Sequence, residues 1–456
     1  MMVRSKYSDS KLMEIRETTL PEARNIIQRS TDSYRELQEM PGFRIYDSLF
    51  DISEALERDS SSLSETIAQE TGKPVKLARE EVEVASQLFR EAAEEAKNRH
   101  GTTLSMDWDK SGLNRTAYSS WISSGPLLYL YSYHSPLLSA SLRAAAALAS
   151  RNSVILKPSS QAPVSSKMLV DLGSRSDFPA GSLQAAFTPG FGNVTKFLVD
   201  SREVKVLAFS GNWSTANRIS SIAGIKKYIM EIYGNATAIV WNDADLDTAA
   251  EQIVRSAFVT STHTGHHLQR ILIHTEAYEY FKNRIAEVAS HLRCGDPMDA
   301  ETDIGPMIST EEADSTQNII NLASSLGGTV ILGGKREGNV VQPTLIEGIS
   351  TSSYLWNNDV PGALVLINPI SSMAEAVKTA NECSSGLYTG LFTADLNLAL
   401  FAGERLQTPM IVVNDYPDFL PAKLPLSGTG KNWTFRNGVS YLMDEMSGTR
   451  EMMIKR

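Results

Sequence analysis

The most constraining feature of this sequence is a regular alternation, from Gly125 onward, of short apolar runs with helix-like segments roughly ten to fifteen residues long. Strands that alternate with helices in this way pair in parallel through crossover connections, as in a doubly wound sheet. The runs fall into two sets: 153–157, 183–187, 204–209 and 236–241, and then 270–274, 329–334, 363–367 and 410–414. The sequence therefore predicts two α/β domains in succession.

The chain before this alternation has two other periods. Roughly the first hundred residues are predicted to be helical. One apolar stripe at helical spacing is formed there by Leu77, Val84, Ala85, Leu88, Phe89, Ala92 and Ala96. The period then changes to two: Leu104, Met106 and Trp108 alternate with polar residues, a DKSG turn follows, and Thr116 and Tyr118 resume the alternation. This pattern predicts a β-hairpin.

The composition limits the classes of function. The chain of 456 residues has a formal net charge of -10 and a pI near 5.4, so it has no basic excess to neutralise a nucleic acid or an anionic membrane. Its start has no apolar segment typical of a secretory signal, and it contains no run of about 18 apolar residues that would span a bilayer. Its two cysteines, Cys294 and Cys383, can form neither a disulfide framework nor a CxxC metal site. These features predict a cytoplasmic protein without nucleic-acid or membrane partners.

Several polar residues stand at predicted strand ends, where doubly wound sheets bind their ligands. Ser210 and Gly211 follow one strand, and Lys157 ends another directly before a proline. The first pattern is more often an ordinary tight turn, and the second is equally typical of a solvated lysine that leaves the sheet. Glu231 follows an apolar run and precedes Gly234, a position that suits either a helix-end acid or a general base.

A histidine cluster stands in the segment FVTSTHTGHHLQRILIH, residues 258–274. His263, His266 and His267 lie within five residues, directly before a predicted strand. Such a cluster is compatible with a metal site, a catalytic segment or a polar loop. The residue types and their spacing leave all three alternatives open.

A series of motifs runs through the chain in a defined order. They are ETGKP (70–74), SYHSPLL (132–138), VILKPSS (154–160), FSGNWS (209–214), MEIYGNATAIV (230–240) and NECSSGLYTGLFT (381–393). Together they resemble motifs of the aldehyde dehydrogenase superfamily along nearly the whole chain. The resemblance implies a Rossmann-type, doubly wound nucleotide-binding domain (1–103 and 125–232) and a second, catalytic-type α/β domain (233–435). It also implies an oligomerisation hairpin with a C-terminal strand (104–124 and 436–456).

The resemblance also implies where the catalytic cysteine of the family would stand, five residues before an arginine in the histidine-rich segment. Counting back from Arg270 leads to Gly265, so no thiol is expected there. Cys294 and Cys383 lie in other motifs and cannot replace it. The family reaction needs thiolate attack on the aldehyde, hydride transfer to nicotinamide and hydrolysis of the thioester. Ordinary thioester catalysis is therefore predicted to be absent.

Three further catalytic positions follow from the same resemblance. Glu231 matches the general base for deacylation. His134 replaces an asparagine that donates to the oxyanion, and His263 stands where the family has a glutamine. His134, His263, His266 and Glu231 have suitable ligand types for a metal, but simple drift after loss of catalysis is the favoured interpretation, and no metal ligand is predicted.

The resemblance implies a dinucleotide site. The residues expected to contact the cofactor are Lys157, Ser159, Ser160, Ser210, Gly211 and Asp359. Ser160 replaces a glutamate that would repel a 2′-phosphate, so NADP is expected to bind at least as well as NAD. Asp359 is a shorter carboxylate than the family glutamate for the nicotinamide ribose.

Three functional hypotheses remain open at this stage. The first is an NAD(P)-dependent oxidoreductase acting on a small aldehyde by descent, without the cysteine mechanism. The second is a non-catalytic nucleotide-binding or assembly subunit, with an active relative as a candidate partner. The third is different, metal-assisted chemistry that uses His134, His263 and His266. All three are compatible with a homodimer or homotetramer.

Overall fold

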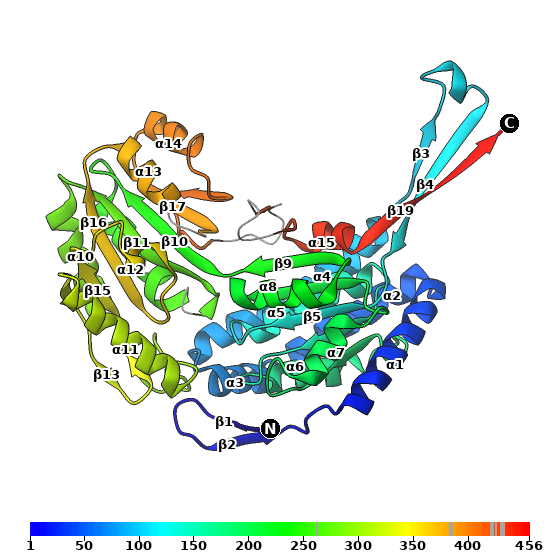
Figure 1. Cartoon of the computed structure of the whole chain (residues 1–456), viewed down its shortest axis with the longest axis horizontal. Helices are drawn as coiled ribbons and strands as arrows, with labels where there is room; N and C mark the ends of the chain where they lie inside the picture. Colours follow the sequence, from blue (N-terminus) through cyan, green and yellow to red (C-terminus); the bar gives the residue numbers. More distant parts are fainter. Residues whose placement is uncertain (261–262, 383–385, 420–423, 425, 429–433) are drawn as a thin grey trace.

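The computed structural model describes residues 1–260, 263–382, 386–419, 424, 426–428 and 434–456. These residues form a five-stranded sheet, a seven-stranded sheet, a three-stranded sheet and two short hairpins (Figure 1). The two large sheets and their helices confirm the predicted α/β class. Among the described helices, none is long and apolar enough to cross a bilayer.

The five-stranded sheet is entirely parallel, in the order β7-β6-β5-β8-β9. Its strands are β5 (Leu127–Tyr131), β6 (Val154–Lys157), β7 (Leu183–Ala185), β8 (Val206–Gly211) and β9 (Lys227–Ile232). The chain starts at the central β5 and later adds strands on both sides, so the strand order reverses beside β5. This switch point is where doubly wound sheets bind ligands. The sequence suggested that Glu231 follows this strand, but Glu231 lies within β9.

Helices cover both faces of this sheet. One face packs on α2 (Gly42–Arg58), α3 (Ser60–Thr71), α4 (Val75–Asn98), α5 (Pro136–Ala149) and α6 (Val164–Gly173). The other packs on α1 (Leu20–Glu39), α7 (Asn193–Asp200) and α8 (Trp213–Ala223). Leu127 and Tyr129 face the first layer, and Leu128 and Leu130 face the second. Burial on both faces explains why these strands are continuous apolar runs in the sequence.

Two expectations for the N-terminal region are wrong in detail. Residues 2–14 form an antiparallel hairpin of β1 (Met2–Arg4) and β2 (Lys11–Glu14) before the helices begin. Val84 is 39% exposed, although the other members of its stripe are buried or partly buried. Adjacent helical positions point about 100° apart, so Ala85 faces the core and Val84 does not.

The seven-stranded sheet has the order β12-β15-β16-β11-β10-β17-β18. Its strands are β10 (Gly234–Val240), β11 (His266–His274), β12 (Thr329–Leu332), β15 (Thr344–Glu347), β16 (Leu364–Ile370), β17 (Tyr388–Phe392) and β18 (Met410–Val413). All neighbours are parallel except β12 and β15. The helices around it include α9 (Leu246–Val254), α10 (Tyr278–Ser290), α11 (Thr310–Ser325), α13 (Met373–Glu382) and α14 (Leu396–Gly403). The order places β10 and β11 side by side, which brings residues 233–234 next to the histidine segment.

The predicted hairpin is present and joins the C-terminal strand. Strands β3 (Thr102–Ser105), β4 (Arg115–Ser123) and β19 (Ser447–Lys455) form an antiparallel sheet in the order β19-β4-β3. Met106 and Trp108 were predicted to lie in the first strand of the hairpin, but they lie in the connection after β3. Figure 1 shows this sheet projecting from the rest of the molecule as an arm with the C-terminus at its tip. Between the arm and the sheets, α15 (Val439–Glu445) packs in the core beside α5.

The arm leads to the first prediction, that the protein is a dimer or a tetramer. The projecting arm exposes Trp108, Met452 and Met453 at 68%, 56% and 57%, and exposed apolar surface of this kind marks protein interaction sites. Light scattering at micromolar concentration should give a multiple of the monomer mass. Met453→Asp should shift the mass towards the monomer, whereas the control Glu337→Gln, on the remote β13 (Arg336–Glu337), should not. A monomeric wild-type protein would contradict the prediction.

Candidate active site

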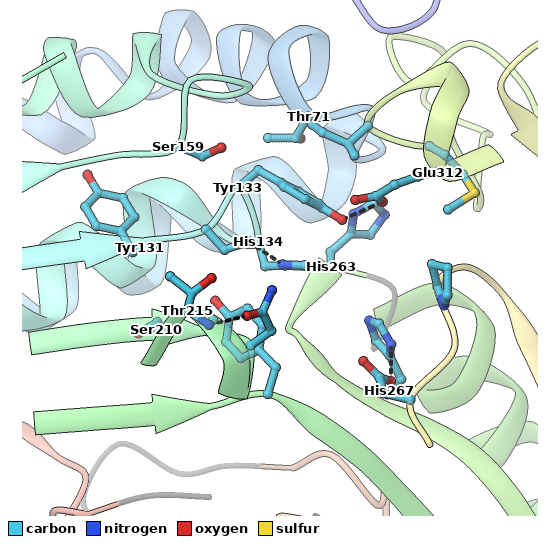
Figure 2. Close-up of a pocket in the computed structure, with 18 of the residues that line it drawn as sticks. Thr71, Tyr131, Tyr133, His134, Ser159, Ser210, Thr215, His263, His267 and Glu312 are labelled. Carbon is cyan, nitrogen blue, oxygen red and sulfur yellow. Dashed lines mark hydrogen bonds and ion pairs between the residues drawn. The ribbon is translucent and has the colours of Figure 1, made fainter. Parts of the chain in front are cut away.

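A cavity of about 1040 Å³ opens at the carboxyl ends of β5, β6 and β8 (Figure 2). Segments 304–308 and 358–363 of the second α/β unit complete its wall. All residues predicted to contact a dinucleotide line it: Lys157, Ser159, Ser160, Ser210, Gly211 and Asp359. His134 and His263 also line it, whereas Glu231 and Gly265 are not among its lining residues. The fold thus gathers the predicted cofactor residues around one space and places two of the predicted catalytic positions behind its wall.

Lys157 is a buried cation without a partner. Its side chain ends β6 and lines the cavity, and the residue is only 8% exposed. Within the described part of the chain, no group forms a hydrogen bond or an ion pair with its ammonium. Burial lowers the pKa of Lys157 to about 8. A buried ammonium without an acceptor is costly, so this end of the cavity is suited to a ligand with hydroxyl or anionic oxygens.

The segment after β8 supports the same wall. Gly211 ends the strand, and Asn212 is the N-cap of α8, where its Oδ1 accepts a hydrogen bond of 2.8 Å from the amide of Thr215. Thr215 lies near Ser210 at the cavity (Figure 2). A helix N-terminus that points at a cavity offers partial positive charge to anions.

Glu231 is held in a buried network instead of facing the cavity. Its Oε2 lies 2.6 Å from Arg143 on α5 and accepts a 2.6 Å hydrogen bond from Ser210. Its other oxygen lies 3.5 Å from Nε2 of His266. Burial alone would raise the pKa of Glu231, but Arg143, His266 and Ser210 outweigh it and lower the pKa to about 2. A carboxylate this acidic and this well paired is a weak base near neutral pH.

The histidines turn towards different partners. Nδ1 of His267 lies 3.1 Å from Asp359, and Nδ1 of His134 lies 2.9 Å from Ser132. His266 faces Glu231 as described. Burial opposes the charged form of His267, but Asp359 outweighs it and raises the pKa of His267. The described residues contain no group of three or more His, Cys, Asp and Glu side chains arranged to hold a metal ion, so the metal-assisted hypothesis gains no support from the geometry.

An aromatic side chain blocks the space next to Gly265. Gly265 has a φ of +77°, which favours glycine, and its carbonyl accepts a hydrogen bond of 3.3 Å from the amide of Gly234. A Cβ at Gly265 would lie 2.8 Å from three ring carbons of Tyr233. This distance is shorter than van der Waals contact between carbons. No side chain at position 265 fits while Tyr233 keeps this position.

The ETGKP motif is linked to the histidine segment through Lys73. Lys73 donates a 3.0 Å hydrogen bond to Ser135, which in turn donates a 2.8 Å bond to the carbonyl of His263. Lys73 also pairs with the buried Glu81, whose Oε1 accepts from the amides of residues 137 and 138 at the start of α5. One buried lysine therefore links α4, the start of α5 and the segment at His263.

Sequence reasoning missed several residues that shape the site. The motifs gave no indication of Arg143, nor of the pair formed by Tyr133 and Glu312, whose hydroxyl and carboxylate are 2.7 Å apart. Figure 2 shows this pair beside the labelled His134. Tyr233 could have been found, because MEIYGN has a tyrosine where the motif it resembles, LELGGK, has a glycine. The partners of Glu231 had no local signal, since α5 and β9 are far apart in the sequence.

These features define a class of protein: a doubly wound nucleotide-binding domain whose cleft faces a second α/β unit. The profile of the aldehyde dehydrogenase family matches residues 1–452, and the chain belongs to this family. It is 33% identical over 392 residues to aspartate-semialdehyde dehydrogenase 1 of Pseudomonas canavaninivorans, which covers 86% of this chain and 83% of that protein. It is 29% identical to 3-sulfolactaldehyde dehydrogenase of Priestia aryabhattai, over 100% of this chain and 94% of that one.

The fold is shared with solved members of the family. Glyceraldehyde-3-phosphate dehydrogenase GapN of Methanocaldococcus jannaschii, complexed with NADP, superimposes with a TM-score of 0.95 at 26% identity, covering 100% of this chain and 99% of that one. An NADP-dependent glyceraldehyde-3-phosphate dehydrogenase of Bacillus halodurans, also complexed with NADP, gives a TM-score of 0.95 at 26% identity and covers 100% of this chain and 95% of that one. The predicted aldehyde dehydrogenase fold class is confirmed.

The second prediction concerns the Glu231 network. Glu231→Gln leaves Arg143 buried without its counter-ion, which should lower the free energy of unfolding by roughly 3–5 kcal/mol. Denaturant midpoints followed by circular dichroism would measure this loss. Glu404→Gln removes the partner of Arg405 in an exposed pair, with side chains 73% and 48% exposed, and serves as the matched control with little expected change.

The same variant has a defined pH dependence. The folded pKa of Glu231 lies below its ordinary value of 4.5, so the stability that its carboxylate contributes is present above 4.5 and is lost as the pH falls towards about 2. The gap between wild type and variant should therefore be constant near neutral pH and should narrow below 4.5. A gap that widens on acidification would contradict this assignment.

Proposed function

We propose that this protein binds NAD(P) and does not oxidise aldehydes through a covalent thioester. The observation that carries the proposal is the contrast between the cavity at Lys157 and the position behind the cavity-lining Tyr233. The region around Lys157 is open and polar, whereas position 265, which the motif alignment assigns to the family nucleophile, is a glycine covered by the ring of Tyr233. The first region supports nucleotide binding, and the second supports loss of the standard reaction.

The residues at the cavity fit a dinucleotide. Lys157 supplies an ammonium for ribose hydroxyl groups, and the N-terminus of α8 faces the place expected for a phosphate. Ser160 lines the cavity where a glutamate would repel a 2′-phosphate, which favours NADP at least as much as NAD. The two solved relatives described above are complexed with NADP. When bound, the nicotinamide group of such a cofactor supplies a hydride acceptor.

The chain offers no replacement for the nucleophile among its described residues. Burial raises the pKa of the Cys294 thiol to about 11, and Cys294 is not part of the cavity lining. Cys383 lies outside the described residues. The carboxylate of Glu231 is committed to Arg143 and Ser210 and is a poor candidate for activating water. His134 keeps a ring nitrogen bonded to Ser132 in place of an asparagine amide at the oxyanion position.

The remaining parts of the proposal concern ligands and partners. A small aldehyde would be the second ligand, since relatives are named for aspartate semialdehyde and 3-sulfolactaldehyde. The protein would act as a homodimer or a homotetramer in the cytoplasm, as a nucleotide-binding or assembly subunit. An active relative is a candidate partner, because the exposed apolar side chains of the arm could pair either with a second copy of this chain or with a relative.

The third prediction tests cofactor binding. Isothermal titration should show that NADP binds no more weakly than NAD. Lys157→Met should weaken binding about tenfold or more, because a hydrogen bond from a charged group is worth roughly 1.5–3 kcal/mol. Lys378→Met, on the exposed side of α13, is the matched control. A tenfold preference for NAD would show that the interpretation of Ser160 is wrong.

The fourth prediction is that the purified protein shows no NAD(P)-linked oxidation of common aldehydes above background. General-base help contributes about 10² to 10⁴-fold, which does not replace covalent catalysis. The formation of NADPH or NADH would be followed by absorbance. An active aldehyde dehydrogenase assayed in parallel would be the positive control. Robust oxidation that alanine at His263 or His266 abolishes would overturn the proposal and indicate histidine-based chemistry.

A further inference from the structure

The two ends of the cavity differ in how their polar groups are satisfied. At the β6 end, the ammonium of Lys157 has no partner among the described residues and the residue is 8% exposed. At the far end, Nδ1 of His267 is paired with Asp359 at 3.1 Å and Tyr133 with Glu312 at 2.7 Å, whereas Nε2 of His267 has no hydrogen-bond partner among the described residues. A ligand gains most where it satisfies an unpaired buried group and least where it must break an existing bond.

Tyr233 also occupies the space that hydride transfer would need. A hydride acceptor must approach the reacting carbon to about 3–3.5 Å, and that carbon is bonded to the side chain at the nucleophile position. A Cβ at Gly265 would already lie 2.8 Å from the ring of Tyr233. The ring is fixed by its surroundings, since it meets His134 edge-on at 5.1 Å and His266 at 5.5 Å between centroids. The reacting carbon and the nicotinamide cannot both be placed next to residue 265.

We propose that this cavity binds nucleotides through their adenosine and phosphate portion alone, and that Tyr233 keeps the nicotinamide out of contact with residue 265. The proposal rests on the proposed nucleotide binding and specifies which part of the ligand carries it. The expected ligands are adenosine diphosphate derivatives, with or without a nicotinamide. The site would not distinguish the oxidised from the reduced form, because the part of the molecule that changes on reduction makes no specific contact.

The proposal predicts the affinities of matched ligand pairs. Isothermal titration of the wild-type protein would compare NAD with ADP-ribose, and NADP with 2′-phospho-ADP-ribose. Each pair should agree within about threefold, and NADP and NADPH should agree equally well. If NADP or NAD binds more than about tenfold tighter than its truncated partner, the inference is wrong while the proposed nucleotide binding stands. If none of these ligands binds, the proposed function itself is wrong.

A variant of Tyr233 tests the cause. Tyr233→Gly should open the space and make the nicotinamide-bearing ligand bind about tenfold tighter than the truncated one, with the affinity of the truncated ligand nearly unchanged. Tyr280→Gly removes an exposed tyrosine of α10 outside the cavity and is the matched control. Equal affinities of both ligands for a folded Tyr233→Gly protein would contradict the role given to Tyr233.

A thiol introduced at position 265 reports on the same space without any nucleotide. Gly265→Cys alone should react with iodoacetamide no faster than the wild-type protein, because the ring of Tyr233 occupies the space that the reagent needs to reach a thiol at this position. The double variant Gly265→Cys with Tyr233→Gly should react clearly faster. Circular dichroism would confirm that both proteins are folded, since a side chain at a φ of +77° is strained. Fast reaction of the single variant would show that Tyr233 does not fill this space.

Discussion

The buried ion pair between Arg143 and Glu231 organises the centre of this molecule. Arg143 lies on a helix behind the first sheet, and Glu231 lies on its edge strand, so the pair fixes the helix against the sheet. Through His266, at 3.5 Å from the second carboxylate oxygen, the same pair reaches the second sheet. Because separating buried charges is costly, moving the Glu231 carboxylate away from Arg143 would cost free energy.

The same kind of pairing recurs at other polar groups of the site. The polar groups that would serve a reaction are bonded to one another: Glu231 to Arg143, His267 to Asp359, and His134 to Ser132. Two cavity-lining groups, the ammonium of Lys157 and Nε2 of His267, have no hydrogen-bond partner among the described residues. The cleft therefore favours an oxygen-rich ligand at the Lys157 end, whereas at the other end Asp359, Tyr133 and Glu312 are already hydrogen-bonded.

Much of the fold follows from local patterns in the sequence, and some of it does not. Strands such as β6 and β11 are buried on both faces and leave continuous apolar runs that reveal them. Two segments were misassigned: the short β1, and Met106 and Trp108 beyond β3. These segments are too short for their hydrophobic pattern to separate a strand from a turn. The cavity lining was predictable in part: Lys157 and Ser210 stand at predicted strand ends, and Ser159 and Asp359 were implied by the family resemblance.

The sequence by itself determined the order of the elements, the family and the identity of residue 265 as glycine. Only the tertiary structure decided which side chain lies next to that glycine. Parallel pairing of β10 with β11 brings Tyr233 beside Gly265, although the two residues are far apart in the chain. It likewise decided that Glu231 meets Arg143 and so loses basicity. Local sequence sets strand and helix through side-chain periodicity, but contacts between distant segments depend on sheet order and register, which no local pattern contains.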